Sequence, residues 1–214
     1  MNSHAALVEQ LKGDILAGTL ERGVPLRQQE LSERYQVSRI PVRDAIATLR
    51  NQGWLVAHGK AGVMVPTLHW QEAEDLYQMR ALLECRLLEH ALGHINYEII
   101  GRARDINASL YSPSLTLLER GRLNWEVHAS LYRAAQRPTL FNTVATLNEQ
   151  VRRYMGFQYG PLDYLDTSQQ EHEQLFDLLE RKEWSQAVTL LQRHIEVAGV
   201  QLVEYLKTTE ELRK

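Results

Sequence analysis

The chain of 214 residues carries 24 Lys and Arg against 27 Asp and Glu, a net charge of −3, and 44% of its residues are hydrophobic. That composition is typical of a globular protein with one large or two small domains. The single cysteine, Cys85, excludes an internal disulfide, and the sequence lacks a signal peptide and any apolar run long enough to span a bilayer, so we expect a cytoplasmic protein without membrane association.

The charge is divided unevenly along the chain. The first 66 residues carry 8 Lys and Arg against 6 Asp and Glu, whereas residues 67–214 carry 16 against 21. The hydrophobic pattern changes at the same place, from mixed helix and strand signals to helical periodicity alone. We therefore predict two domains, residues 1–66 and 67–214, in a mainly α protein.

Three helices are predicted in the N-terminal domain. Apolar residues at helical spacing predict the first over residues 5–17, and a turn at residues 23–25 separates it from a short second helix at 30–35. The third helix begins after Ser38, whose hydroxyl is placed to cap it, and ends at Gly53.

The third helix carries different chemistry on two of its sides. Its apolar stripe, at i, i+3, i+4 and i+7, consists of Val42, Ala45, Ile46 and Leu49. Three arginines project from another side, namely Arg39, Arg43 and Arg50. Pro41 is tolerated because the N–H groups of a first helical turn have no helical partner.

A small β-hairpin is expected after this helix. Two β-prone runs, residues 54–57 and 63–65, flank a turn with a basic tip formed by His58, Gly59 and Lys60. A helix, a tight turn, a second helix with outward arginines and a basic hairpin together fit duplex DNA, because guanidinium groups match guanine edges and phosphates. The same residues could instead form a solvated basic face beside an ordinary hairpin, but their succession favours DNA.

The segment that carries these features resembles the winged helix-turn-helix of GntR-family bacterial transcription regulators. The resemblance covers residues 5 to 66 and rests on Gln36-Val37-Ser38-Arg39-Ile40-Pro41-Val42-Arg43-Asp44-Ala45-Ile46, followed by Leu49, Gly53 and the tip His58-Gly59-Lys60. It implies that Arg39 and Arg43 contact operator bases and phosphates, and that Gly59 approaches the minor groove. The sequence departs from the family at Ile40, where threonine is usual, and at Gln29, where a basic residue is frequent.

Beyond residue 66 the pattern predicts an antiparallel all-helical bundle. Helical periodicity runs through residues 70–93, 97–110, 114–136, 139–155, 168–181 and 184–207. Residues 156–161 are expected to interrupt it because they contain two glycines and a proline.

Four polar residues of this bundle fall on the apolar faces of their helices. Projection at 100° per residue places Asn124 and His128 on one such face, His172 on a second and His194 on a third. A single inward histidine is usually a hydrogen-bonded core residue, but three from three helices favour shared partners or a metal ion.

The first bundle helix places Arg80 and Glu84 on its apolar face. Their i, i+4 spacing fits an internal ion pair. Arg80 could equally bind the carboxylate of a small molecule, and the two roles can coexist.

The bundle, from about residue 70 to 207, resembles the FCD effector domain of the FadR subfamily of GntR regulators. The matching residues are Arg80, Glu84, Asn124, His128, Glu171, His172 and His194. The resemblance implies a divalent metal, zinc or nickel, at Asn124, His128, His172 and His194, and an organic acid effector near Arg80 and Glu84. Asn124 replaces the usual aspartate, so we expect weaker metal binding or a three-histidine site completed by effector or water.

These observations favour a ligand-responsive regulator that binds a palindromic operator as a homodimer. A regulator whose bundle serves only dimerisation is the main alternative. A helical metalloenzyme is a weaker one, because no general base such as that of a His-Glu-x-x-His motif accompanies the histidines.

Overall fold

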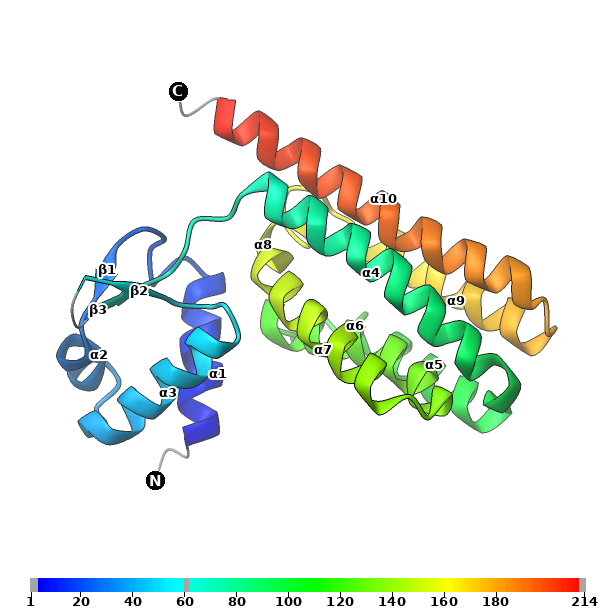
Figure 1. The fold of residues 1–214 in the computed structure, drawn as a ribbon, viewed down its shortest axis with the longest axis horizontal. Coiled ribbons are helices and arrows are strands. Elements are labelled where there is room, and N and C mark those ends of the chain that lie inside the picture. The colour runs from blue at the N-terminus through cyan, green and yellow to red at the C-terminus, as the bar shows by residue number, and fades with distance from the viewer. Residues whose placement is uncertain (1–3, 60–61, 212–214) are drawn as a thin grey trace. The chain divides into compact units, whose positions relative to one another are not determined.

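The computed structural model describes residues 4–59 and 62–211. The chain separates into two compact units, one extending to Leu68 and the other beginning at His69 (Figure 1). None of the helices in these described ranges is long and apolar enough to cross a membrane. Lys60, placed at the hairpin tip by the sequence, lies outside the described residues.

The N-terminal unit combines three helices with a small antiparallel sheet (Figure 1). Its helices are α1 (His4–Leu16), α2 (Gln28–Arg34) and α3 (Arg39–Asn51). Its strands are β1 (Pro25–Leu26), β2 (Val56–His58) and β3 (Gly62–Met64). β3 lies in the middle, so that Val63 aligns with Leu26 on one side and with Ala57 on the other.

The core of this unit forms where α1, α2 and α3 pack together. The predicted apolar stripe of α3 is buried, as are four apolar residues of α1: Leu7, Val8, Leu11 and Ile15. α1 is followed by Gly18 at a φ of +74°, a conformation that favours glycine. In the turn between α2 and α3, the Ser32 hydroxyl donates to the carbonyl of Val37.

Three local expectations need correction in the N-terminal unit. Ser38 occupies the N-cap of α3, but its side chain makes no capping hydrogen bond. The predicted turn at residues 23–25 runs into strand β1, because Pro25 and Leu26 pair with β3 on the side away from β2. The strand predicted from Trp54 begins only at Val56, because the backbone N–H groups of Trp54 and Leu55 donate back to the carbonyl of Leu49.

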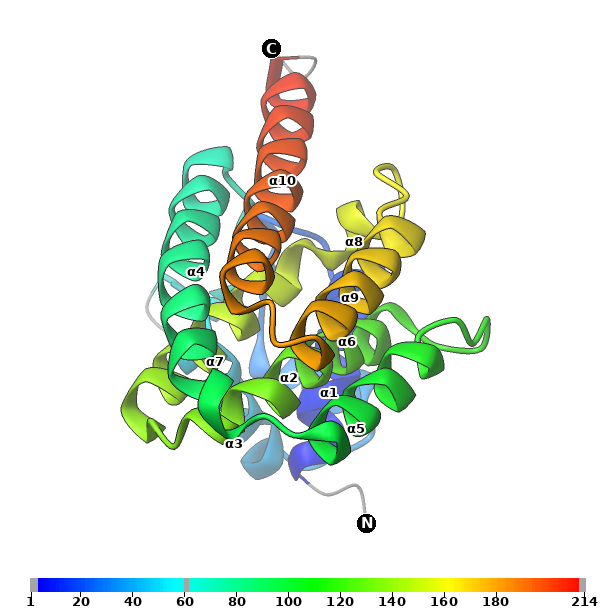
Figure 2. The ribbon, with the colours of Figure 1, turned by 90° about the vertical axis from the view of Figure 1, so that its right-hand side faces the viewer.

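The C-terminal unit is a helical bundle, as the periodicity predicted (Figure 2). Its main helices are α4 (Trp70–Ala91), α5 (Tyr97–Ser109), α6 (Leu117–Tyr132), α7 (Pro138–Val151), α9 (Leu165–Glu180) and α10 (Trp184–Glu211). A short helix, α8 (Met155–Gln158), occupies part of the segment where an interruption was expected. Short 3₁₀ turns, η1 (Leu92–His94), η2 (Arg133–Ala135) and η3 (Arg152–Tyr154), follow α4, α6 and α7.

Contacts between the long helices position the polar interior of the bundle. α10 packs along α4 and α9, and the three run side by side in Figure 1 and Figure 2. α5 packs against α6 and α9, and α4 also contacts α7 and α6. α6 begins in a capping box, in which the Thr116 hydroxyl accepts from the Glu119 backbone N–H and the Glu119 carboxylate accepts from Thr116. The inner faces of α4, α6, α9 and α10 thus meet in the interior.

Candidate functional site

The arginines of α3 lie on the surface of the N-terminal unit. Arg39, Arg43 and Arg50 are all exposed, whereas the apolar stripe on the opposite side is buried. Arg39 donates to the amide oxygen of Gln29 on α2 at 3.3 Å, and Arg43 pairs with the neighbouring Asp44 at 3.1 Å. Both contacts are exposed, so either guanidinium can exchange its partner for a phosphate or a base edge.

Other predicted DNA contacts lie near the ends of α3 and β2. Pro41 stands in the first turn of α3, and the preceding Ser38 is exposed. Ile40, between Arg39 and Pro41, exposes 64% of its surface. His58 ends β2 and is exposed, and Gly59 follows at a φ of +58° with open space where a Cβ would stand.

In the bundle, three histidines from different helices converge. His128 on α6, His172 on α9 and His194 on α10 are at most 6% exposed, and one nitrogen from each lies within 4.8 Å of the others. The Nε2 atoms of His128 and His172 are 3.1 Å apart. The structure therefore brings together the three histidines that the sequence placed on separate apolar faces.

The Nδ1 atoms of the three rings face outward, each toward a polar side chain. That of His172 lies 2.9 Å from Asn107 Oδ1, and that of His194 lies 2.7 Å from Glu171 Oε2. That of His128 lies 3.5 Å from the Tyr132 hydroxyl. A carboxylate can only accept, and the Asn107 Nδ2 group already donates to Glu173 and to the carbonyl of Gln169. The Nδ1 atoms of His172 and His194 are therefore donors.

Protons on Nδ1 leave lone pairs on the inner nitrogens. The pKa of His128 lies well below its usual value because of burial and, next, its histidine neighbours. Burial and, next, the neighbouring His194 ring lower the pKa of His172 in the same way. The Nε2 lone pair of His172 therefore faces His128 Nε2, which donates or accepts there according to its tautomer. The 3.1 Å between these nitrogens is close to the roughly 3.3 Å that separates two nitrogens on one tetrahedral zinc ion. The donor set thus fits a divalent metal ion.

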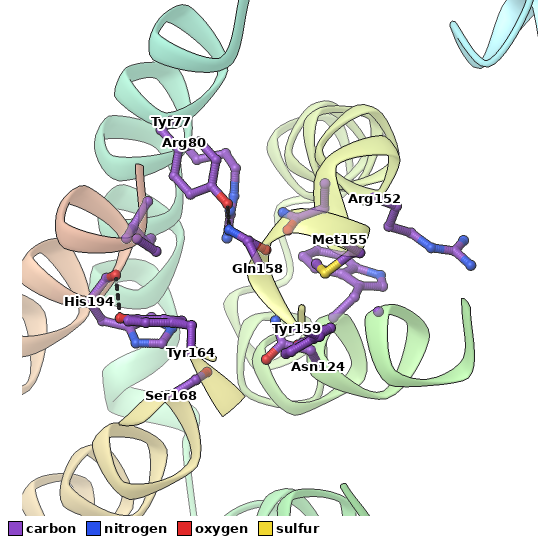
Figure 3. A pocket seen from close by; sticks show the side chains of 15 residues that line it. Tyr77, Arg80, Asn124, Arg152, Met155, Gln158, Tyr159, Tyr164, Ser168 and His194 are labelled. Atoms are coloured by element: carbon purple, nitrogen blue, oxygen red, sulfur yellow. Dashed lines mark hydrogen bonds between the residues drawn. The ribbon is translucent and has the colours of Figure 1, made fainter. Parts of the chain in front are cut away.

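Asn124 lies one helical turn before His128 and lines a small cavity that reaches the histidine cluster at His194. The cavity has a volume of about 20 Å³, and His194, Arg80 and Tyr164 also line it. Figure 3 shows Tyr77 and Arg80 reaching it from α4, Gln158 from α8 and Asn124 from α6. This volume accommodates about one water molecule, so a ligand larger than water requires the lining side chains to move.

The Arg80 guanidinium lines this cavity and also forms the predicted ion pair. Its Nε donates to Glu84 Oε1 at 2.6 Å, and both residues are buried. Glu84 also accepts from Asn148 at 2.9 Å and from the Tyr132 hydroxyl at 2.9 Å. Because Glu84 does not line the cavity, the structure places it behind Arg80.

Several residues around the histidines had no role in the sequence analysis. Asn107 and Tyr132 hold His172 and His128, and Tyr164 donates to the same Glu171 oxygen that holds His194. Glu171 belongs to the motif that matched the family, but the motif did not indicate which ring it contacts. The hydrogen bond from His194 lowers the pKa of Glu171 despite its burial, so this acceptor is ionised at neutral pH.

Comparison with protein families accounts for both units. The family described as "Bacterial regulatory proteins, gntR family" matches residues 4–65, and the "FCD domain" matches residues 75–197. The chain therefore belongs to the GntR-family transcription regulators with an FCD domain.

Similar curated proteins are regulators as well. The Nta operon transcriptional regulator of Aminobacter aminovorans is 26% identical over 188 residues, covering 86% of this chain and 87% of that protein. The HTH-type transcriptional repressor RspR of Escherichia coli is 24% identical over 195 residues, covering 87% and 82%. These relatives are transcription regulators, and the enzyme alternative finds no support among them.

Solved structures resemble the chain over nearly its whole length. A GntR-family transcriptional regulator from Pseudomonas syringae is 31% identical, covers 97% of this chain and 88% of its own, and has a TM-score of 0.56. Escherichia coli McbR/YncC is 18% identical and has a TM-score of 0.74, with coverage of 96% and 99%, which shows a shared fold.

Proposed function

We propose that this bacterial transcription regulator binds a palindromic operator as a homodimer and senses a small organic acid at a divalent metal site in its bundle. The observation that carries the proposal is the meeting of three buried imidazoles, whose outer nitrogens have polar partners and whose inner nitrogens converge beside an arginine-lined cavity. Buried imidazoles in this arrangement are typical of metal ligands held by outer hydrogen bonds.

In the proposed complex with DNA, α3 enters the major groove. Arg39 and Arg43 read base edges and phosphates, with Ser38, Pro41 and Arg50 along the same helix near the backbone. His58 and Gly59 follow the adjacent backbone or minor groove, and Gly59 permits close approach because it has no Cβ. The exposed Ile40 side chain suits contact with a thymine methyl group.

In the proposed effector site, His128, His172 and His194 hold zinc or nickel, and Asn124 offers a neutral carbonyl oxygen. When bound, the metal ion would supply positive charge and an open coordination position. Arg80, held by Glu84, faces the same cavity and would bind a carboxylate of the effector. With neutral protein ligands, the ion keeps its full charge, which favours an anionic effector.

The homodimer is proposed to form through the outer face of α4 and α10. This face carries a groove of about 440 Å³ and two exposed apolar side chains, Leu82 at 73% and Val200 at 56%. Glu196 and Lys207 line the same groove at different levels of α10. In a dimer with a two-fold axis, Glu196 of one copy can therefore lie next to Lys207 of the other.

A bundle that serves only dimerisation is the second possibility. It is favoured by Glu84, whose carboxylate accepts from Arg80, Asn148 and Tyr132, so that the charge of Arg80 has a protein partner. Metal analysis separates the two functions.

The test is elemental analysis with native mass spectrometry of the purified protein. We expect one divalent ion per chain, and none in the double variant His172→Ala with His194→Ala. The matched control, His90→Ala with His94→Ala, removes two histidines that lie outside the cluster and should retain the ion. Wild-type protein that holds no ion, even after zinc or nickel is added, would leave dimerisation as the bundle's function.

A further inference from the structure

A chain of buried hydrogen bonds connects the cavity arginine to the histidine cluster. Arg80 Nε lies 2.6 Å from Glu84 Oε1, the Tyr132 hydroxyl lies 2.9 Å from Glu84 Oε2, and the same hydroxyl lies 3.5 Å from His128 Nδ1. All four residues are at most 5% exposed. Arg80 and Glu84 are one turn apart on α4, and His128 and Tyr132 are one turn apart on α6, so two packed helices complete the connection.

The chemistry of the groups fixes the direction of the two hydrogen bonds to Glu84. Arg80 can only donate, and the Glu84 carboxylate can only accept. The Tyr132 proton therefore points to Glu84, and the hydroxyl oxygen is left to accept from His128. The contact to His128 is a hydrogen bond when Nδ1 carries the ring proton, which is the tautomer that a metal ion on Nε2 requires. In that tautomer the Nε2 lone pair faces His172 Nε2 at 3.1 Å.

We propose that Glu84 and Tyr132 couple the two halves of the effector site, so that an anion on Arg80 and a divalent cation on the histidines each strengthen the binding of the other. This inference rests on the proposed function, because it takes the cation and the anion as ligands of that site. It assigns Tyr132 and Glu84 as positioning residues that contact neither ligand.

The coupling follows from the charge that Glu84 shares among three donors, of which Arg80 and Tyr132 belong to the chain and Asn148 is the third. An anion bound to Arg80 neutralises part of the guanidinium charge, so the interaction between Arg80 and Glu84 weakens. The Glu84 carboxylate then accepts more strongly from the Tyr132 hydroxyl. The polarised hydroxyl oxygen accepts more strongly from His128 Nδ1, which makes Nε2 a better donor to a metal ion. A cation on Nε2 strengthens the same chain from its other end, as thermodynamic reciprocity requires.

The test measures zinc affinity by competition with a chromophoric chelator, with saturating sodium acetate or with sodium chloride at equal ionic strength. In the wild type, we expect acetate to raise zinc affinity about 5-fold or more. Tyr132→Phe removes the hydroxyl and keeps the ring, and we expect it to bind zinc about 10-fold more weakly and to lose the acetate effect.

The matched control is Tyr154→Phe. Tyr154 is also buried, and its hydroxyl also donates to a glutamate, Glu72, at 2.6 Å, but it lies outside the cavity lining and the histidine cluster. This variant should bind zinc and respond to acetate as the wild type does. Thermal melting of the metal-free proteins checks that each variant is folded.

Three outcomes would overturn the coupling. An equal acetate effect in the wild type and Tyr132→Phe would mean that the anion contacts the ion directly, and no acetate effect in the wild type would mean that the sites are independent. In both cases zinc still binds, so the proposed metal site would stand. A wild type that binds no zinc would remove the coupling and the metal site together, while operator binding of the same sample is tested separately by gel shift.

Discussion

Arg39 and Arg43 occupy the same exposed surface of α3, but they have different neighbours. Gln29 on α2 holds Arg39 through its amide oxygen, whereas Arg43 contacts Asp44, the next residue on its own helix. Arg43 is therefore the arginine whose protein partner is an exposed acid, and its side chain is 65% exposed. Bound DNA would replace that exposed ion pair with a more concentrated negative charge.

We predict that Arg43→Ala weakens binding to a selected operator by about 1–3 kcal/mol. If Arg43 contacts a phosphate, the variant should also reduce the dependence of affinity on salt by about one unit of slope, because one fewer phosphate is neutralised. The measurement is fluorescence anisotropy at several salt concentrations, on duplexes selected from a random pool.

The control for this prediction is Arg86→Ala. Arg86 is an arginine of similar exposure, 62% at its side chain, but it lies on α4 of the bundle. It should bind the operator as the wild type does. An Arg43→Ala protein with wild-type affinity would contradict the assignment of α3 as the DNA-reading helix.

At the scale of the element, helix α4 makes a different kind of contact on its inner face, on its outer face and in its first turn. Its inner face buries the Arg80 and Glu84 pair, its outer face exposes Leu82, and its first turn places Glu72 against the 3₁₀ turn that follows α7. Arg153 and Tyr154 donate to the two Glu72 oxygens, each at 2.6 Å. The start of α4 is thereby fastened to the end of α7.

The Glu72 contact makes part of the stability dependent on pH. Burial alone would raise the pKa of Glu72, but the hydrogen bonds from Arg153 and Tyr154 outweigh it and lower the pKa below its ordinary value of 4.5. A carboxyl whose pKa is lower in the folded state stabilises the protein above the unfolded pKa, and this contribution is lost as the pH falls through the folded value.

We therefore predict that Glu72→Gln lowers the free energy of unfolding at neutral pH and reduces its loss between neutral pH and about pH 3. Urea unfolding at a series of pH values measures both effects. Glu74→Gln, which removes a charge two residues further along the same helix, is the control and should follow the wild-type pH dependence. Parallel curves for Glu72→Gln and the wild type would contradict the prediction.

At the scale of the whole molecule, the proposed regulation requires two copies of the chain. A palindromic operator presents the same half-site twice, and a closed dimer with two-fold symmetry matches it. Allostery then needs only a difference in effector affinity between two arrangements of the paired DNA-binding units. The α4 and α10 face is the surface proposed to hold the copies together.

We predict that Leu82→Glu converts the protein to a monomer, because it places a charge in the centre of an apolar contact. Light scattering at micromolar concentration measures the mass, and the same sample should bind a palindromic operator more weakly than a wild-type dimer does. Tyr97→Glu, a change at a similarly exposed apolar residue on α5, should leave the dimer intact. A wild-type monomer, or a Leu82→Glu dimer, would remove this interface.

Much of the fold could be predicted because helical periodicity is a local property. The apolar stripe of α3 and the long bundle helices stand close to where the spacing placed them. The exceptions are elements defined by pairing. Pro25 and Leu26 form a strand only because β3 lies beside them. Trp54 stands outside the predicted strand because its backbone N–H donates to the carbonyl of Leu49 at the end of α3.

The sequence by itself determined that certain polar residues of the bundle turn inward, since the face of a residue depends only on 100° per residue along one helix. It therefore placed Arg80, His128, His172 and His194 in the interior. Only the tertiary structure decided which of them meet and what holds them. Asn107 and Tyr132 reach the histidines, and Glu84 reaches Tyr132, because separate helices pack together, and no spacing within one helix encodes such a distance.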